Sequence, residues 1–360
     1  MNQPIKVLVV DDSALMRKMI PQMLERDSGI RVVGTAMDGG FALEKAAELK
    51  PDVITLDLEM PRMNGIEALR QLAKKHQVIV VSAHTTEGAN ATFKALAMGA
   101  FDFVPKPEHG ASQHIDSIAT QLTAKIRAAA QARQVGPPAY ALPDFPKVRK
   151  IARAKVAPSR VIAIGVSTGG PNAVQYVLSH LPADFSGSIL VVQHMPEGFT
   201  EMFARRLDEC CSLNVKEAQS GDLLLAGRVL ICPGSRHLKV KRLPLGDIAI
   251  LSDDPRVNGH RPSADVLFRS VAEEFVERSV GVIMTGMGDD GANGLGLIKA
   301  AGGTTIAQSE QSCVVFGMPK AAIERGHAMR VVDLEAMANT LQAQCSHARN
   351  EKGVGAGQSW

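Results

Sequence analysis

Ile5-Lys6-Val7-Leu8-Val9-Val10 and Pro51-Asp52-Val53-Ile54-Thr55-Leu56 are two short apolar runs, and acidic residues follow each of them directly. Asp11 and Asp12 come after the first run, and Asp57 comes after the second. Runs of this kind are typical of buried strands in an open parallel sheet, whose carboxyl ends meet on one edge where ligands bind. We therefore expect three carboxylates to gather at one edge of a parallel sheet.

Two further polar residues end later apolar runs. Ser82 follows the run 78–81, and Lys106 follows Phe103-Val104-Pro105. Three crowded carboxylates repel one another unless a hard cation lies among them, and Mg²⁺ suits such oxygen ligands. The set can accept a phosphoryl group on Asp57, with Mg²⁺, Lys106 and the Ser82 hydroxyl neutralising its oxygens. The alternative is that the acids cap helices, with Ser13 or Asp12 as one cap. Capping explains one acid but not a cluster with a lysine.

The order of these features resembles a known family. The matching residues are Asp11-Asp12, Asp57 with the stretch 60–65 after it, Ser82-Ala83 and Lys106-Pro107. Residues 4–122 resemble the receiver domain of two-component response regulators, which has a flavodoxin-like fold. The resemblance implies that Asp57 is phosphorylated by a histidine kinase, with Asp11, Asp12 and Asp57 holding Mg²⁺. It also implies that phosphorylation draws Ser82 inward and repacks Phe103.

Length and composition set outer bounds on the rest of the chain. A chain of 360 residues is long enough for two domains with separate cores. Its net charge of +3 argues for neither nucleic acid nor membrane as the main partner. It has no apolar run of 18 residues and no signal peptide pattern, so we expect no direct membrane insertion. Its five cysteines form no C-x-x-C pair, which favours a reduced, cytoplasmic protein without a zinc site.

A linker separates the two halves. We assign 123–157 to a helix extension followed by a linker, because four prolines and a glycine fall within 136–146 and exclude a helix there. The basic residues in 147–155 fit a solvated linker or a surface for an acidic partner, and nucleic acid is the less favoured alternative. We expect a second domain over 158–346 and a disordered tail over 347–360.

The second half again shows a strand followed by a glycine-rich turn and a helix. The run 161–164 leads into Gly165-Val166-Ser167-Thr168-Gly169-Gly170-Pro171. Pro171 suits the first turn of a helix, and Ser167 would then lie beside N–H groups that can hold an anion. The pattern G-x-S-x-G marks a nucleophilic serine, but a turn that binds phosphate or is only structural explains this segment equally well.

A candidate base and a candidate acid at equivalent strand ends favour the interpretation of Ser167 as a nucleophile over a turn that binds phosphate or is only structural. His194 follows the buried run 188–192 and precedes Met195-Pro196. Asp289 and Asp290 follow the run 280–284, and adjacent residues in a turn point in different directions, so we expect one of them to reach His194. The chain order Ser, His, Asp differs from the Ser, Asp, His order of α/β-hydrolases. The same chemistry would thus be reached on another topology.

A second resemblance covers this half. Four stretches carry it: 167–171, 193–196, 260–268 and 285–292. Residues from about 158 to 346 resemble the catalytic domain of the chemotaxis response-regulator methylesterases, the CheB family. The resemblance implies Ser167 as nucleophile, His194 as base and Asp290 as the acid that orients it, with the backbone N–H groups of Thr168 and Met287 as oxyanion donors. The family more often has Asn where this chain has Asp289, which places an extra negative charge near the triad. Arg261 is either near the active site, where it would attract an acidic substrate segment, or part of an ordinary helix cap.

The two resemblances together imply a fold class and a function. The fold class is α/β, with two doubly wound parallel-sheet domains, a flavodoxin-like receiver and a Rossmann-like methylesterase domain, joined by a linker. The implied function is phosphorylation-activated hydrolysis of glutamate γ-methyl esters on the cytoplasmic helices of chemoreceptors, with deamidation of receptor glutamines as a second activity. Ester hydrolysis would need no cofactor, and the unmodified receiver would inhibit it. The alternatives are a transcriptional regulator, whose second half would be shorter, helical and basic, and an inactive scaffold that competes for phosphoryl groups.

Overall fold

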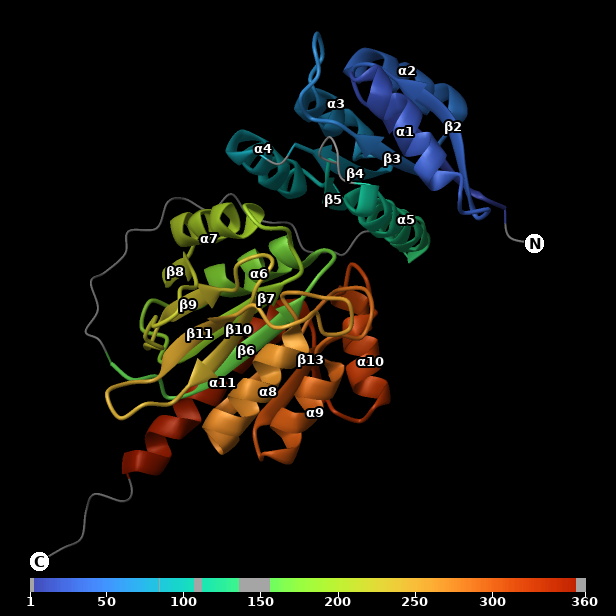
Figure 1. Ribbon diagram of the computed structural model, residues 1–360. Coiled ribbons are helices and arrows are strands. Elements are labelled where there is room, and N and C mark those ends of the chain that lie inside the picture. Colours follow the sequence, from blue (N-terminus) through green and yellow to red (C-terminus); the bar gives the residue numbers. More distant parts are fainter. Residues whose placement is uncertain (1–2, 84, 107–111, 136–155, 354–360) are drawn as a thin grey trace, which may run out of the picture. The chain divides into compact units, whose positions relative to one another are not determined.

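The computed structural model describes residues 3–83, 85–106, 112–135 and 156–353. The chain divides into two compact units, Met1–Pro137 and Pro138–Trp360, and each has its own parallel sheet (Figure 1). Most of the predicted linker, residues 136–155, lies outside the described residues. Within the part of the chain that is described, no helix is long and apolar enough to cross a membrane.

The first unit has five parallel strands in the order β2-β1-β3-β4-β5. This order is the one found in flavodoxin-like folds, so the predicted fold class is confirmed for this half. The strands are β1 (Ile5–Val10), β2 (Ile30–Ala36), β3 (Val53–Leu56), β4 (Gln77–Ser82) and β5 (Asp102–Pro105). The helices are α1 (Ala14–Leu24), α2 (Gly39–Leu49), α3 (Gly65–Leu72), α4 (Thr86–Ala97) and α5 (Ser112–Val135).

Local sequence accounts for the helix ends of this unit. The side chain of Ser13, not that of Asp12, caps α1 by accepting a hydrogen bond from the N–H of Met16. The expected end of the domain at residue 122 falls inside α5. Ile126 and Ala129 beyond it are fully buried, because they continue the apolar face of the helix.

The second unit has seven parallel strands in the order β14-β13-β12-β6-β7-β9-β8, with β10 and β11 forming a separate antiparallel pair. The strands are β6 (Val161–Val166), β7 (Ser188–Gln193), β8 (Asn214–Glu217), β9 (Arg228–Ile231), β10 (His237–Lys241), β11 (Ile248–Ser252), β12 (Ser279–Ile283), β13 (Thr304–Gln308) and β14 (Arg330–Val332). The helices are α6 (Gly170–Ser179), α7 (Phe199–Cys210), α8 (Ala264–Phe275), α9 (Ala292–Ala300), α10 (Met318–Glu324) and α11 (Leu334–Gly353), and two short 3₁₀ turns lie at Val276–Arg278 and Glu310–Ser312.

Helices cover the central strands of this sheet. In Figure 1, α8 and α9 lie side by side in orange, and α10 packs on α9. Helix α6 packs on α7 and α11. Every residue of β6, β7 and β12 is buried, as expected for strands covered on both faces. The strand order reverses direction between β6 and β12, which is where ligands bind in doubly wound sheets.

The C-terminal segment differs from the sequence prediction. Helix α11 continues to Gly353, so residues 347–353 are helical where we predicted disorder. Ala348, Arg349, Glu351 and Lys352 are good helix formers, and extending an existing helix costs much less than nucleating a new one. Residues 354–360 lie outside the described residues.

Candidate functional site

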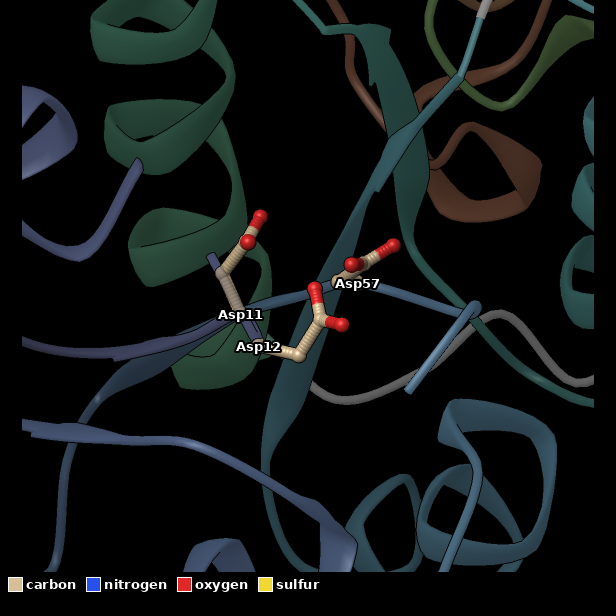
Figure 2. Close-up of side chains that lie close together, drawn as sticks. All are labelled: Asp11, Asp12 and Asp57. Atoms are coloured by element: carbon tan, nitrogen blue, oxygen red, sulfur yellow. The ribbon is translucent and has the colours of Figure 1, made fainter. Parts of the chain in front are cut away.

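The three predicted acids of the first unit lie together at the carboxyl ends of two neighbouring strands. Asp11 and Asp12 follow β1, Asp57 follows β3, and these strands pair through Val10 and Leu56. One carboxylate oxygen of each acid lies within 4.8 Å of the other two. Figure 2 shows the three side chains close together. Asp11 and Asp57 are buried, whereas Asp12 is exposed. The strand-end prediction therefore holds for all three acids.

Lys106 closes this cluster from the end of β5. Its Nζ lies 2.6 Å from Asp57 Oδ2 and 3.2 Å from Asp11 Oδ2. Burial raises the pKa of Asp57 to about 6, with Lys106 opposing the shift and the charge of Asp11 adding to it. Burial likewise raises the pKa of Asp11. Burial also disfavours the charged form of Lys106, but the contacts with Asp57 and Asp11 outweigh it and raise the pKa of the amine.

The donor set of this cluster fits a divalent cation. Asp11 Oδ2 is buried, and its contact among the described residues is the ion pair with Lys106 Nζ at 3.2 Å. A single ammonium group leaves three neighbouring carboxylates only partly neutralised. A hard cation between Asp11, Asp12 and Asp57 would coordinate that oxygen and relieve the repulsion between the acids.

The side chains of Ser82 and Phe103 contact α4. The Ser82 hydroxyl donates to the carbonyl of Gly88 in α4 at 3.1 Å. Phe103 is buried and meets the ring of Phe93 edge to face, with 6.4 Å between centroids. Both residues therefore contact α4, and the expected inward movement of Ser82 stays a prediction.

The second unit brings its three predicted residues to one edge of the sheet. Ser167 follows β6, His194 follows β7, and Asp290 lies in the loop after β12. Strand β6 pairs with both neighbours, Val166 with Gln193 and Gly165 with Ile283. The three residues thus lie beyond the carboxyl ends of neighbouring strands, as predicted.

Two glycines allow the backbone to pack closely around Ser167. Gly169 has a φ of 75°, a left-handed conformation that side chains other than glycine rarely adopt, and it reverses the chain into α6. A Cβ on Gly286 would lie 2.7 Å from Cβ of Ser167. Gly286 therefore lets the loop after β12 approach the serine.

Asp290 is the acid that meets His194. His194 Nε2 lies 2.8 Å from Asp290 Oδ2, and Asp290 is 1% exposed. The start of α8 holds the same carboxylate: Ala264 N donates to Oδ2 at 2.7 Å and the Ser263 hydroxyl donates to Oδ1 at 2.6 Å. Burial opposes ionisation of Asp290 most strongly, but the hydrogen bond and charge of His194 and the bonds from Ser263 and Ala264 outweigh it and lower its pKa. Asp290 is therefore held as a carboxylate by a helix N-terminus.

The two ring nitrogens of His194 have different environments. Nε2 bonds to Asp290, and Nδ1 is the other ring nitrogen. Nδ1 is buried and has no hydrogen-bond partner among the described residues. An imidazole that donates Nε2–H to Asp290 keeps a lone pair on Nδ1. In the described part of the chain neither His194 Nδ1 nor the Ser167 hydroxyl is engaged in a hydrogen bond, so both remain available for a proton transfer.

Asp289 does not compete for His194. Its side chain is 51% exposed and forms an ion pair with Arg325. The residues alone left Asp289 and Asp290 open, and the family resemblance implied Asp290. The fold separates them because Asp290 turns inward towards α8, whereas Asp289 turns towards Arg325.

Two functional neighbours escaped the sequence analysis. His260 stacks on His194 with 4.0 Å between ring centroids and 5° between planes. Burial, followed by the charge of His194, lowers the pKa of His260 to about 4. Ser263 occupies the N-cap position of α8, but its hydroxyl bonds to Asp290 rather than to the helix. The stretch 260–268 was noted as a motif, but nothing in it showed which side chains face the triad.

The remaining predicted residues lie in the same loops as Ser167, Ser263 and Asp290. Thr168 is buried and Met287 is 38% exposed, and neither backbone N–H donates to a described residue. Both N–H groups are thus available to donate to a ligand. Arg261 uses Nη1 to bond the carbonyls of Asp253 and Asp254 at 3.0 and 3.3 Å. It therefore holds its own loop together, in a stretch that both caps α8 and touches the triad.

Comparisons with known proteins agree with these two units. Residues 162–341 match the family model described as CheB methylesterase, and residues 7–116 match that of the response regulator receiver domain. A protein from Koribacter versatilis named protein-glutamate methylesterase/protein-glutamine glutaminase 2 is 61% identical over 354 residues, covering 96% of this chain and 98% of the relative. A Symbiobacterium thermophilum protein named protein-glutamate methylesterase/protein-glutamine glutaminase is 46% identical, covering 94% and 97%.

A solved structure resembles the second unit. The catalytic domain of Thermotoga maritima CheB methylesterase is 40% identical, with a TM-score of 0.50, and the match covers 51% of this chain and 97% of that domain. Together with the strand-end sites, these matches show that the chain belongs to the CheB family of protein-glutamate methylesterases/protein-glutamine glutaminases, with a receiver domain ahead of the methylesterase domain.

Proposed function

We propose that this chain hydrolyses glutamate γ-methyl esters on chemoreceptors, with Ser167 as nucleophile, His194 as base and Asp290 as the acid that orients His194. The observation that carries this proposal is the pairing of His194 Nε2 with the buried Asp290, which leaves Nδ1 for Ser167. The family membership gives the reaction class, and the geometry supports these residues for it.

The reaction then follows the logic of a serine hydrolase. Ser167 Oγ attacks the ester carbonyl while His194 Nδ1 takes its proton. The backbone N–H groups of Thr168 and Met287 stabilise the oxyanion of the tetrahedral intermediate. The proton on His194 goes to the leaving methanol, and a water activated by the same nitrogen releases glutamate and restores Ser167. A glutamine amide passes through an equivalent intermediate and releases ammonia, so deamidation uses the same residues.

His260 suits this cycle because it stays neutral at pH 7. A second positive ring stacked on His194 would disfavour the imidazolium that forms in each half-reaction. The low pKa of His260, about 4, avoids that repulsion.

We further propose that the receiver domain controls this activity through phosphorylation of Asp57. Asp11, Asp12 and Asp57 would hold Mg²⁺, which would neutralise the oxygens of the incoming phosphoryl group. Lys106, 2.6 Å from Asp57, would contact the same oxygens, and Ser82 and Phe103 would respond to the new charge. The phosphodonor would be a chemotaxis histidine kinase, and the substrate would be the cytoplasmic helices of receptors. The protein would thus act in the cytoplasm in chemotaxis adaptation, with the catalytic domain over about 158–346.

Methanol release from methylated receptor tests both proposals. Wild type should release methanol faster with acetyl phosphate and Mg²⁺, and Asp57→Asn should remain at the basal rate because an amide accepts no phosphoryl group. Ser167→Ala should lose about 10³-fold or more in kcat while keeping its fold. A Ser167→Ala variant that retains a tenth of wild-type activity would exclude Ser167 as the nucleophile.

A further inference from the structure

Gln193 is a buried polar residue that the catalytic roles above leave unexplained. It is the last residue of β7, it pairs with Val166 of β6, and it is 2% exposed. Its side-chain Nε2 donates to the carbonyl of Ser167 at 2.9 Å and to that of His194 at 3.2 Å. One amide group therefore joins the backbone at Ser167 to the backbone at His194.

The bond to Ser167 fixes the direction of the next N–H group. In a trans peptide the C=O of one residue and the N–H of the next point in opposite directions. Two donors hold the Ser167 carbonyl: Gly170 N at 2.8 Å and Gln193 Nε2 at 2.9 Å. The N–H of Thr168 lies in the same peptide plane, so it is turned to the opposite side, where it meets no acceptor among the described residues. Thr168 N–H is the donor assigned above to the oxyanion.

The other side of the turn is held separately. Thr285, which follows β12 and is fully buried, donates its hydroxyl to the carbonyl of Thr168 at 2.9 Å. Thr285 also accepts the N–H of Ser167 through its own carbonyl at 3.0 Å. Gln193 from β7 thus fixes the peptide group between Ser167 and Thr168, and Thr285 from the loop after β12 fixes the peptide groups on either side of it. Oxyanion stabilisation depends on donors that are fixed before the charge develops.

A purely packing role explains Gln193 poorly. Its Oε1 is buried and accepts no hydrogen bond from the described residues, which an apolar side chain of similar size would avoid. The amide also needs a neighbour without a side chain, because a Cβ on Gly170 would lie 2.1 Å from Oε1. A buried group that is unfavourable for stability and bonded to two active-site carbonyls indicates a functional constraint.

We propose that Gln193 is a positioning residue that aims the Thr168 N–H at the oxyanion and holds the turn at His194 in register with it. This inference rests on the proposed function, because it assumes that Ser167 forms a tetrahedral intermediate. Gln193 itself contacts neither the ester nor the proton in transfer. Its loss should therefore affect the transition state rather than the binding of the substrate.

Gln193→Met tests the proposal in the full chain, activated with acetyl phosphate and Mg²⁺. Met has nearly the same length but donates no hydrogen bond. We expect kcat for methanol release to fall about 10-fold or more, short of the roughly 10²–10³-fold cost of deleting an oxyanion donor, with KM within about twofold of wild type. An alkylboronic acid that forms a tetrahedral anion on Ser167 should lose affinity by the same factor as kcat. A packing role would not link these two quantities.

Gln193→Glu provides a second measurement in case the Met variant does not fold. An ionised carboxylate has the same shape but only accepts hydrogen bonds, whereas its protonated form can donate one. Its kcat relative to wild type at the same pH should recover as the pH falls. The matched control is Gln175→Met: Gln175 is a buried glutamine of α6 that bonds to Arg206, and its loss should leave kcat and boronate affinity within about twofold.

The outcomes separate this inference from the proposed function. If the wild-type protein shows no ester hydrolysis that depends on Ser167, the proposed function is refuted. If wild type hydrolyses the ester through Ser167, but folded Gln193→Met keeps wild-type kcat and boronate affinity, the inference alone is refuted. A ratio of the Gln193→Glu kcat to the wild-type kcat that does not change with pH would refute the inference as well.

Discussion

Replacing Asp290 by Asn should nearly abolish turnover while leaving the fold in place. Two groups donate to each carboxylate oxygen: His194 Nε2 and Ala264 N to Oδ2, and the Ser263 hydroxyl and Asp265 N to Oδ1. An asparagine has one oxygen, which accepts, and one NH₂ group, which only donates. One of the two pairs of donor groups must therefore face the NH₂ group. At Oδ1 the Ser263 hydroxyl can reverse and accept, and the bond from Asp265 N is long, at 3.3 Å. At Oδ2 the N–H of Ala264, at 2.7 Å, can only donate, so an NH₂ group there would cost more. The amide oxygen should therefore take the place of Oδ2, and His194 keeps a hydrogen bond but loses a negative charge.

The size of the loss follows from the distance between the two groups. At 2.8 Å the attraction between an imidazolium and a carboxylate is about 6 kcal/mol for an effective dielectric constant of roughly 20. This energy corresponds to about four powers of ten in rate, close to the effect of the same change in serine proteases. We expect kcat to fall about 10³–10⁴-fold. The loss of one good acceptor should lower the free energy of unfolding by about 1–3 kcal/mol.

Asp289→Asn is the matched control, because it makes the same chemical change one residue away. Asp289 is half exposed and pairs with Arg325, and an exposed pair of this kind contributes no more than about 1 kcal/mol. Its kcat for methanol release should stay within about threefold of wild type. Urea unfolding of both variants would show that each is folded. Greater damage from Asp289→Asn than from Asp290→Asn would overturn the assignment of the acid.

Three further changes test other parts of the argument. Ser263→Ala removes the 2.6 Å bond to Asp290, so it should lower the free energy of unfolding by about 1–2 kcal/mol and reduce kcat severalfold. An unchanged kcat would limit the Ser263 hydroxyl to a role in stability. The pKa of Asp57, about 6, lies above its unfolded value of about 3.9, so the folded state binds more protons between these values and stability falls as the pH rises through that window. In Asp57→Asn, the urea midpoint of unfolding measured from pH 4 to 7 should no longer show this decrease in stability. An equally steep decrease in the variant would mean that another group causes it. A fragment covering 156–360 should exceed the unphosphorylated full chain in methanol release if the receiver inhibits, and equal rates would mean that phosphorylation acts by another route.

Much of both sites could be predicted because it depends on a local pattern. Short apolar runs that end in Asp11, Asp57, Ser167 or His194 identify themselves as strands and place the polar residue at a strand end. Parallel sheets bring those ends to one edge whatever the exact order of the strands. The resemblance to known families then supplied the roles of these residues.

The sequence by itself determined the two α/β units, the acidic cluster and the residue types of the triad. The family resemblance already implied Asp290 rather than Asp289, but only the tertiary structure showed that His194 meets it through Nε2, and that Ser263, His260 and Gln193 lie beside these residues. The physical reason is the long separation in sequence between the residues that meet. The bond between His194 and Asp290 spans 96 residues and that between Ser263 and Asp290 spans 27, and the direction of a side chain across such a separation is set by packing between elements. Periodicity records which face of a strand or helix is buried, but it does not record which partner that face meets.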